Sequence, residues 1–396
     1  MASENTEKKL SIGLTPGSEA YVQNLNNSIV TTGNNYRVKK LLEKLKAGKT
    51  VYVAAIGGSV TEGGGPEDYL DGYAFQFAEK LQKAFPAAKV VFDGAGLSGT
   101  PSSLGVVRYE KDVVKTLGHS PDLLIIEFAV NDGDDCTGTR GFERIIRNVL
   151  EAENDGAVIP VYAHASYENN QATQMPVADF YKLPQISLKN ALKNPDVQID
   201  LAGGGEYFTD YAHPTTEGHG FMADCLMNLL KVIDNMNEDK KYEVPAGFKN
   251  ENPFKEFYTL YSNVQDSNVK VVCGDFCDKD PYSYGLKKGG TIFPDNWHHT
   301  KGTDSFKLEL ECKSLIFVYK VQATYLEEKF GQAVVLVDGK VAAEYDGANS
   351  PAGAWNNNVN RLLIDETETK KHTVEVKMKD GDENKGFSIL AIGYSK

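Results

Sequence analysis

The chain has 396 residues, of which 41% are hydrophobic, and this is enough for two domains with sizeable cores. Its 55 acidic residues outnumber 42 Lys and Arg, and the net charge of −13 argues against nucleic acid or anionic lipid as the main partner, because both require a positive surface. No run approaches the roughly 20 apolar residues of a membrane helix, and the first residues lack the apolar core of a secretory signal. We therefore expect a cytoplasmic protein without a nucleic-acid or membrane partner, whereas the oligomeric state is not predicted.

Residues 36–235 alternate between helical and strand-like patterns. Five apolar runs bounded by turn residues predict buried strands at 51–56, 89–92, 122–130, 157–163 and 197–201. Apolar residues at helical spacing predict helices at 36–45, 73–85, 106–117, 142–150 and 222–233. Strands that alternate with helices in this way predict an α/β domain, in which a parallel five-stranded sheet is sandwiched by helices.

The pattern changes after residue 236. Residues 237–257 are charged, contain two Pro and show no period, so we interpret them as a linker. The runs beyond it are strand-like, at 269–273, 306–310, 314–320, 333–345, 372–378 and 387–394. Asp338-Gly339 predicts a hairpin turn inside one of them, and the short strands together indicate an all-β sandwich. The predicted domains are residues 1–236 and 258–396.

Polar, Gly-containing segments follow the first three predicted strands, and another short segment with Asp and His precedes the last helix. They are IGGSVTEGGG (56–65), DGAGLSGTPSS (93–103), AVNDGDD (129–135) and DYAHP (210–214). Ligands of open parallel sheets bind outside the carboxyl ends of the strands, so these four segments can converge on one site.

The residue types in these segments fit nucleophilic catalysis. A serine hydroxyl attacks a carbonyl only when a base removes its proton and a carboxylate orients that base, and Ser59, His213 and Asp210 supply such a set. Donors must also face the developing oxyanion, and the amides of Ser59 and Gly99 with the side chain of Asn131 would serve. The alternatives are a polar turn residue at Ser59 and a helix cap at His213.

The same segments resemble a known family. G-G-S-V-T-E-G (57–63), G-L-S-G-T (96–100), A-V-N-D (129–132) and D-Y-A-H (210–213) resemble, in order, the four blocks of the SGNH hydrolases, also called GDSL esterases. The resemblance implies a flavodoxin-like sheet, a Ser59–His213–Asp210 triad, an oxyanion hole from Ser59, Gly99 and Asn131, and no metal or other cofactor. Gly58 departs from the Asp, and Ala129 from the Gly, that the blocks usually carry.

A dinucleotide site is the competing interpretation of one segment. Residues 94–99, G-A-G-L-S-G, match the pattern G-x-G-x-x-G. That pattern needs a helix that opens at once on the pyrophosphate, and residues 100–103 delay the helix. It also needs an acidic residue about 20 positions on, and Glu127 at the end of the next strand is too far away. We therefore expect no nucleotide cofactor.

Three further residues are candidates for substrate binding. His164 follows the fourth predicted strand, with a structural role as the alternative, and Trp297 and Trp355 lie in polar, loop-like segments of the second domain. An aromatic face flanked by Asn and His suits a sugar ring, although each Trp can equally fill the core of the sandwich. The architecture resembles carbohydrate esterase family seventeen, acetylesterases of mannan oligosaccharides that carry a jelly-roll carbohydrate-binding module.

These observations together predict a carboxylic ester hydrolase. Its expected substrate is an acetylated plant-polysaccharide oligosaccharide, with mannan first and xylan second, and its expected route is an acetyl-Ser59 intermediate. The alternatives are a lipid or aryl esterase of the same family and a carbohydrate-binding protein without catalysis. The sequence shows no acidic cluster to which calcium can be assigned.

Overall fold

The computed structural model describes residues 16–192, 207–250, 254–264, 266–280, 292–321, 329–349 and 357–396. The chain divides into two compact units, here called the α/β unit and the β unit, with the main boundary between residues 251 and 252. The first part of the predicted linker belongs to the α/β unit, since Tyr242 donates from its hydroxyl to the carbonyl of Tyr181, and Arg147 donates to the carbonyl of Pro245 over 2.6 Å.

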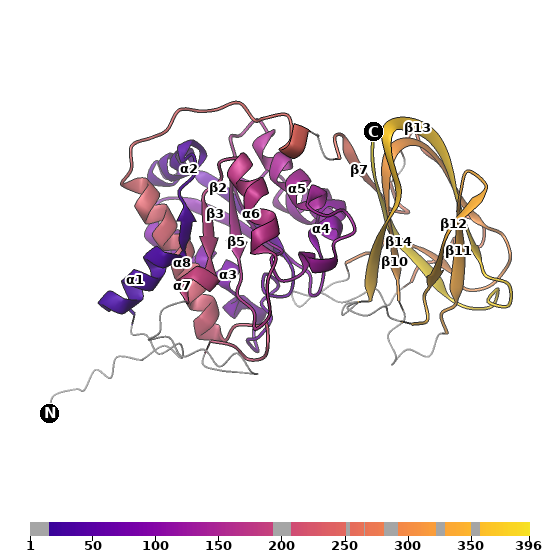
Figure 1. Cartoon of the computed structure of the whole chain (residues 1–396), viewed down its shortest axis with the longest axis horizontal. Coiled ribbons are helices and arrows are strands. Elements are labelled where there is room, and N and C mark those ends of the chain that lie inside the picture. Colours follow the sequence, from indigo (N-terminus) through magenta and orange to yellow (C-terminus); the bar gives the residue numbers. More distant parts are fainter. Residues whose placement is uncertain are drawn as a thin grey trace. The chain divides into compact units, whose positions relative to one another are not determined.

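In the described residues, a sheet of six strands forms the centre of the α/β unit (Figure 1). Five strands are parallel, in the order β3-β2-β4-β5-β6: β2 (Thr50–Gly57), β3 (Lys89–Gly96), β4 (Leu123–Glu127), β5 (Ala157–Tyr162) and β6 (Gln185–Ser187). The sixth, β1 (Ile29–Thr31), pairs antiparallel with β6 at the edge. The parallel strands have the flavodoxin-like order 2-1-3-4-5, so the predicted fold class is confirmed.

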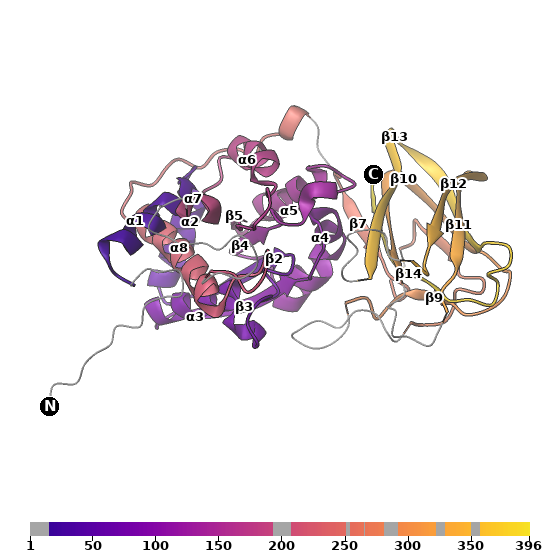
Figure 2. The same cartoon turned by 60° about the horizontal axis from the view of Figure 1, so that its bottom comes forward.

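Helices cover both faces of this sheet. They are α1 (Glu19–Ser28), α2 (Tyr36–Lys46), α3 (Tyr73–Ala84), α4 (Ser102–Tyr109), α5 (Arg140–Leu150), α6 (Gln171–Phe180), α7 (Leu188–Ala191) and α8 (Thr216–Asp234). Figure 2 shows α5 and α6 on one side of the strands and α3 and α8 on the other. Apolar side chains of α2, α3, α7 and α8 form one buried cluster with the strands.

The fifth parallel strand differs from the prediction. The run at 197–201 lies outside the described residues, and β6 at 185–187 occupies the fifth parallel position. Both β1 and β6 have only three residues, too few to show an alternating pattern. Pro176 lies inside α6 and masks its helical signal, since proline usually ends a helix.

Over the part of the β unit that the structure describes, an antiparallel sheet of eight strands is formed. They are β7 (Phe257–Leu260), β8 (Lys270–Val272), β9 (Trp297–His299), β10 (Phe306–Lys320), β11 (Gln332–Val337), β12 (Lys340–Asp346), β13 (Asn358–Met378) and β14 (Phe387–Ser395). The path runs β12-β11-β13-β10-β14-β7, with β8 on β10 and β9 on β14. The predicted Asp338-Gly339 hairpin is confirmed, because both residues have positive φ (51° and 77°) between β11 and β12.

Bending of the long strands lets this one sheet enclose a core. The two predicted runs at 306–310 and 314–320 form the single strand β10, with irregular register between Cys312 and Ser314. Figure 1 shows β13 arching from β10 and β14 on one side to β11 and β12 on the other. The apolar side chains between the two sides form the core of this unit.

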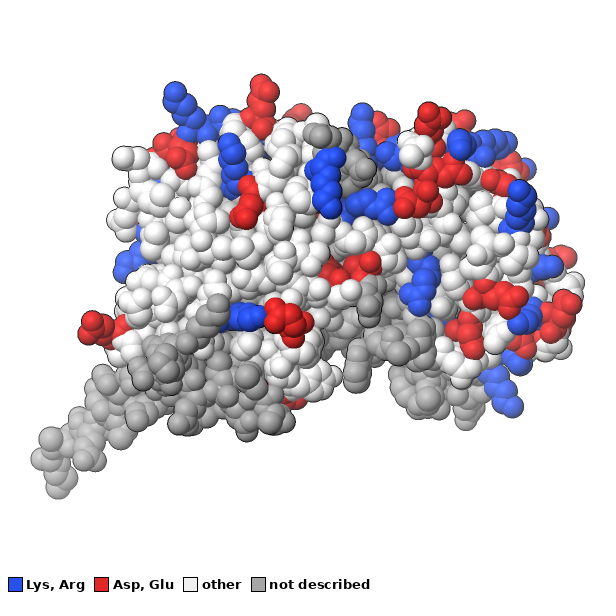
Figure 3. Space-filling view, in the orientation of Figure 1, with Lys and Arg blue, Asp and Glu red and all other residues white. Residues whose placement is uncertain are grey.

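The surface carries both signs of charge. On the face drawn in Figure 3, Lys and Arg side chains are interspersed with Asp and Glu over both units. Within the described ranges, no helix is both long and apolar enough to cross a bilayer. Nor does that part of the chain gather three His, Cys, Asp or Glu side chains in a group that could hold a metal ion.

Candidate active site

Ser59, His213 and Asp210 form a continuous hydrogen-bonded chain at the carboxyl end of the sheet. Ser59 follows β2 by two residues, and His213 lies three residues before α8. His213 Nδ1 is 2.7 Å from Asp210 Oδ2, and Nε2 is 2.8 Å from Ser59 Oγ. A carboxylate only accepts, so Nδ1 carries the imidazole proton and Nε2 is free to accept from the Ser59 hydroxyl. This is the protonation pattern that a general base requires.

Asp210 is held as an anion by its own turn. Its Oδ1 accepts hydrogen bonds from the backbone N–H groups of Ala212 (2.8 Å) and His213 (2.9 Å). Partial burial disfavours the charged form, but the hydrogen bonds from the His213 ring and from these two amides outweigh it and hold the pKa of Asp210 below its ordinary value. Asp210 therefore stays ionised and fixes the ring of His213.

Glycines allow the site to assemble at short range. A Cβ on Gly64 would lie 2.7 Å from His213 Cδ2, and one on Gly58 would lie 1.9 Å from Asn131 Oδ1. The departure of Gly58 from the family's usual Asp thus has a local reason, because the side chain of Asn131 occupies that space. Buried His219 supports the same turn: its Nδ1 accepts from the Tyr73 amide (3.0 Å), and its Nε2 donates to the Gly64 carbonyl (2.9 Å).

The predicted oxyanion donors lie on three neighbouring turns. Gly99 has a φ of 67°, a conformation that glycine adopts without strain. Asn131 follows β4, and its Oδ1 is buried against Gly58 without a partner in the described residues, which leaves Nδ2 as the donor end of the amide. Across the described part of the chain, no carbonyl or side chain accepts from the backbone N–H of Ser59 or Gly99. These amides can therefore donate to a ligand.

Two carboxylates, those of Glu62 and Asp132, hold these turns in place. Glu62 Oε2 accepts from the backbone N–H (2.8 Å) and the hydroxyl (2.5 Å) of Ser98, the neighbour of Gly99. Asp132 Oδ1 accepts from the Ser102 amide at the start of α4 over 2.7 Å, and its Oδ2 accepts from the Gln174 side chain over 2.7 Å. The role of Asp132 can be inferred from sequence, because its partner amide lies at a helix N-terminus, which favours acidic partners. The contact of Glu62 with Ser98 has no recognisable sequence pattern.

Glu127 is a fully buried carboxyl at the end of β4. Neither of its carboxyl oxygens has a hydrogen-bond partner in the described residues. Burial raises the pKa of Glu127 to about 7, although the nearby backbone N–H groups of Val130 and Ala129 favour the charged form. The main-chain carbonyl of Glu127 accepts from the Gly58 amide over 3.3 Å, so the backbone of this residue is tied to the nucleophile turn.

The three predicted substrate-binding residues occupy different environments. His164 follows β5 and packs its ring at 5.6 Å from that of Phe208; burial, and secondarily the charge of Lys189, lower the pKa of His164 to about 4. Trp297 is only 3% exposed and packs edge-to-face on Phe306, so it fills the core, which is the alternative left open above. Trp355 lies outside the described residues.

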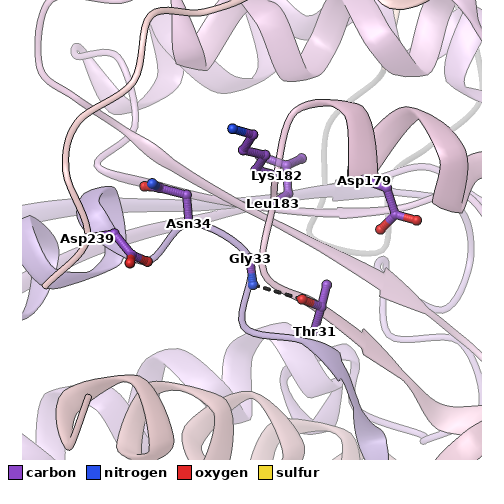
Figure 4. Close-up of a pocket in the computed structure, with 7 residues that line it drawn as sticks. All are labelled: Thr31, Gly33, Asn34, Asp179, Lys182, Leu183 and Asp239. Carbon is purple, nitrogen blue, oxygen red and sulfur yellow. Dashed lines mark hydrogen bonds between the residues drawn. The ribbon is translucent and has the colours of Figure 1, made fainter. Parts of the chain in front are cut away.

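A hollow of about 350 Å³ elsewhere in the α/β unit is separate from this site (Figure 4). It is lined by Thr31, Gly33, Asn34, Asp179, Lys182, Leu183 and Asp239. Lys182 and Leu183 precede β6, so the hollow lies at the amino end of that parallel strand, whereas the triad lies at the carboxyl ends. Figure 4 shows the Lys182 ammonium turned away from the carboxylates of Asp179 and Asp239.

The chain is similar to known proteins both in family and in overall structure. Residues 55–221 match the model of the GDSL-like lipase/acylhydrolase family. A solved structure described as a two-domain esterase (CEX) active on acetylated mannans is 26% identical, with a TM-score of 0.79, and the similarity covers 94% of this chain and 98% of that one. A second structure with the same description, co-crystallized with mannopentaose, is 25% identical, with a TM-score of 0.78 and the same coverage. No curated protein sequence matches the chain.

The matched range of the family model spans every residue of the triad and of the predicted oxyanion hole. Within that range, His213 is hydrogen-bonded to Ser59 through one ring nitrogen and to Asp210 through the other, as ester cleavage by a serine nucleophile requires. Residues 55–221 therefore form a GDSL-like lipase/acylhydrolase domain, and the chain is a carboxylic ester hydrolase.

Proposed function

We propose that the protein removes O-acetyl groups from plant-polysaccharide oligosaccharides, acetylated mannan above all. The observation that carries the proposal is the extent of the likeness to the esterase active on acetylated mannans: it covers 94% of this chain, and so both units. A likeness confined to the α/β unit would support an ester hydrolase and nothing finer, because one fold hosts many substrates.

The proposed reaction uses the geometry of the triad. The Oγ of Ser59 attacks the acetyl carbonyl carbon while its proton passes to Nε2 of His213, 2.8 Å away. The tetrahedral oxyanion accepts hydrogen bonds from the amides of Ser59 and Gly99 and from the Asn131 side chain. His213 then returns the proton to the departing sugar oxygen, which leaves an acetyl ester on Ser59 and a free sugar hydroxyl.

The second half of the reaction regenerates the enzyme. Water gives a proton to His213 Nε2 and attacks the acetyl-Ser59 carbonyl, and the second tetrahedral species collapses to acetate and the Ser59 hydroxyl. Asp210 stays ionised throughout and stabilises the imidazolium of His213, in line with the lowered pKa of its carboxyl. These steps need no cofactor.

The test is release of acetate from acetylated mannan, acetylated xylan and an aryl acetate by the wild type and by Ser59→Ala. We expect the wild type to deacetylate mannan fastest and Ser59→Ala to lose about 10⁴-fold or more on every ester, as is usual when a triad nucleophile is removed. Cleavage of the aryl acetate alone would contradict the carbohydrate substrate. Wild-type rates in Ser59→Ala would contradict the nucleophile itself.

A further inference from the structure

Two tyrosines beside the triad are unusually exposed. Tyr167 is 44% and Tyr211 46% exposed, and they form the one ring pair in the described part of the chain in which both rings are exposed. Most other aromatic side chains near the triad loop are buried, among them Tyr207 and Phe208. Contiguous exposed apolar surface marks interaction sites, and Tyr is among the residues in which binding energy is concentrated.

The position of the pair is tied to the catalytic residues. Tyr211 is the residue after Asp210 and lies two residues before His213, in the turn whose amides bind Asp210 Oδ1. Tyr167 follows β5 on the next loop, and the two loops are joined where the Ser166 amide donates to the Tyr211 carbonyl over 2.8 Å. The loop that carries Tyr167 is thereby joined to the turn that carries Asp210, Tyr211 and His213.

The geometry of the rings leaves room for a ligand. Their centroids are 6.3 Å apart and their planes are inclined by 42°, so neither ring covers the face of the other. Burial, followed by the charges of Glu127, Tyr211 and Asp210, raises the pKa of Tyr167 to about 12. Its hydroxyl therefore stays neutral at physiological pH and can donate a hydrogen bond. A sugar presents apolar C–H faces and hydroxyl groups, which match an aromatic face with a polar tip.

We propose that Tyr167 and Tyr211 form the stacking platform for the sugar ring that carries the scissile acetyl ester. The inference rests on the proposed function and extends it, since it names the side chains that select a glycan over a simple ester. A small aryl acetate lies within the triad and oxyanion hole and does not need this platform. An acetylated oligosaccharide gains binding energy from the rings, and losing them raises its KM.

The experiment compares kcat and KM of Tyr167→Ala and Tyr211→Ala on acetylated manno-oligosaccharide and on an aryl acetate. We expect KM for the oligosaccharide to rise roughly five- to tenfold in each variant, while aryl acetate kinetics stay within about twofold. Tyr167→Phe and Tyr211→Phe keep the stacking face and should retain most of the affinity. Phe180→Ala is the matched control, because Phe180 is an aromatic residue that is 37% exposed at the C-terminus of α6. This variant should leave kcat and KM unchanged for both substrates.

Two results would overturn the platform. One is an unchanged KM for the oligosaccharide in the alanine variants; the other is an equal loss on both substrates, which would mean that the tyrosines only hold the Asp210 loop. Inhibition of aryl acetate hydrolysis by unacetylated mannopentaose separates this outcome from failure of the proposed function. If wild type leaves glycan esters intact but mannopentaose inhibits it and not the alanine variants, the proposed function fails, whereas sugar-ring binding by Tyr167 and Tyr211 stands. If wild type leaves glycan esters intact and mannopentaose inhibits neither the wild type nor the alanine variants, the proposed function and the platform both fail.

Discussion

Each unit contains a Ser, a His and an Asp that are joined by hydrogen bonds. In the α/β unit the histidine is central: His213 contacts Asp210 with one ring nitrogen and Ser59 with the other, over 2.7 and 2.8 Å. The side chains of His213 and Asp210 are 24% and 41% exposed, so solvent and substrate reach them.

In the β unit the serine is central. Ser388 donates from Oγ to Asp280 Oδ2 over 2.7 Å and accepts from His298 Nδ1 over 2.9 Å. The same carboxyl oxygen of Asp280 lies 2.6 Å from the Lys320 ammonium. All four residues are buried, and Ser388 has no exposed surface.

The difference shows that residue types do not define a hydrolytic site. A nucleophile must pass its proton to a free base. Ser388 directs its proton to Asp280, whose charge Lys320 already neutralises, and His298 donates to Ser388 instead of accepting from it. The order of the hydrogen bonds and access for an ester carbonyl distinguish the two sets. The set in the α/β unit is built for chemistry, and the set in the β unit satisfies buried polar groups.

Replacing the two histidines gives the largest expected contrast. His213→Ala removes the general base and should lower kcat for an aryl acetate by about 10⁴-fold or more, with little change in melting temperature. His298→Ala is the matched control: aryl acetate turnover should stay within about twofold, and the β unit should lose about 1–3 kcal/mol of stability, because Ser388 loses a buried partner. Comparable losses of turnover in both variants would contradict the division of roles.

The second contrast concerns Lys320 and Asp280. Lys320→Met leaves the carboxylate of Asp280 buried and without its cation, and breaking such a pair costs about 3–5 kcal/mol. Chemical denaturation followed by circular dichroism should show this loss, and aryl acetate turnover at 25 °C should persist. Adding Asp280→Asn removes the buried charge and should restore part of the stability. A loss below about 1 kcal/mol in Lys320→Met would show that water already reaches the pair.

The third contrast lies within the catalytic site, between proton transfer and oxyanion binding. Asn131→Ala keeps the triad intact but removes one oxyanion donor, which typically costs about 10²–10³ in kcat. KM for the aryl acetate should change little, because the donor acts mainly on the transition state. Near-normal kcat would mean that Asn131 does not contact the oxyanion.

Gly58→Ala provides an independent route to the same result. The added Cβ would lie 1.9 Å from Asn131 Oδ1, so the Asn131 side chain must move. We expect a loss in kcat that approaches the loss in Asn131→Ala, and the double variant should be little worse than Asn131→Ala alone. Full additivity of the two losses would contradict an effect through Asn131.

The sequence predicted those features of the fold and site that depend on neighbouring residues in the chain, and it missed those that depend on distant contacts. The Asp210 turn and the Gly-rich turn around Ser59 are each formed by consecutive residues, so their geometry can be inferred from local sequence. The parallel sheet then predicts that both turns lie at the carboxyl ends of its strands. Glu62 was not predicted, since its contact with Ser98 joins turns 36 residues apart. Tyr167 and Tyr211 were not predicted as binding residues, because their exposure follows from packing that the sequence does not display.

In the β unit most strands were predicted from apolar, strand-like runs, but β7, β9 and the first part of β13 were not, and neither were the roles of the polar residues. Trp297 lies in the polar segment PDNWHHTKG, which favours a loop, yet it belongs to the three-residue strand β9 and packs in the core. The polar neighbours of Trp297 are satisfied internally, for example His298 by Ser388. Local composition alone therefore does not predict whether an aromatic ring binds a ligand or packs in the core.

The smallest contrast compares the two buried carboxyls, Asp280 and Glu127. Asp280 has a cation and a hydroxyl within hydrogen-bond distance, whereas Glu127 has neither, and burial raises its pKa from 4.5 to about 7. The folded protein thus keeps a proton on Glu127 that the unfolded chain releases above its ordinary pKa. Because the unfolded state binds fewer protons in this range, stability falls as the pH rises from about 4.5 to about 7 and stays lower above it.

Glu127→Gln imitates the protonated carboxyl at every pH and should remove this dependence. At 1.36 kcal/mol per pKa unit, the variant should exceed wild type by about 3 kcal/mol at pH 8 and match it near pH 4.5. Chemical denaturation of both proteins at these two pH values measures the difference. Equal stability at pH 8 would show that the Glu127 carboxylate has a partner, and the contrast with Asp280 would then disappear. A gain at pH 8 would mean that the turn behind Ser59 tolerates a carboxyl at a cost in stability, which the β unit avoids by pairing its own.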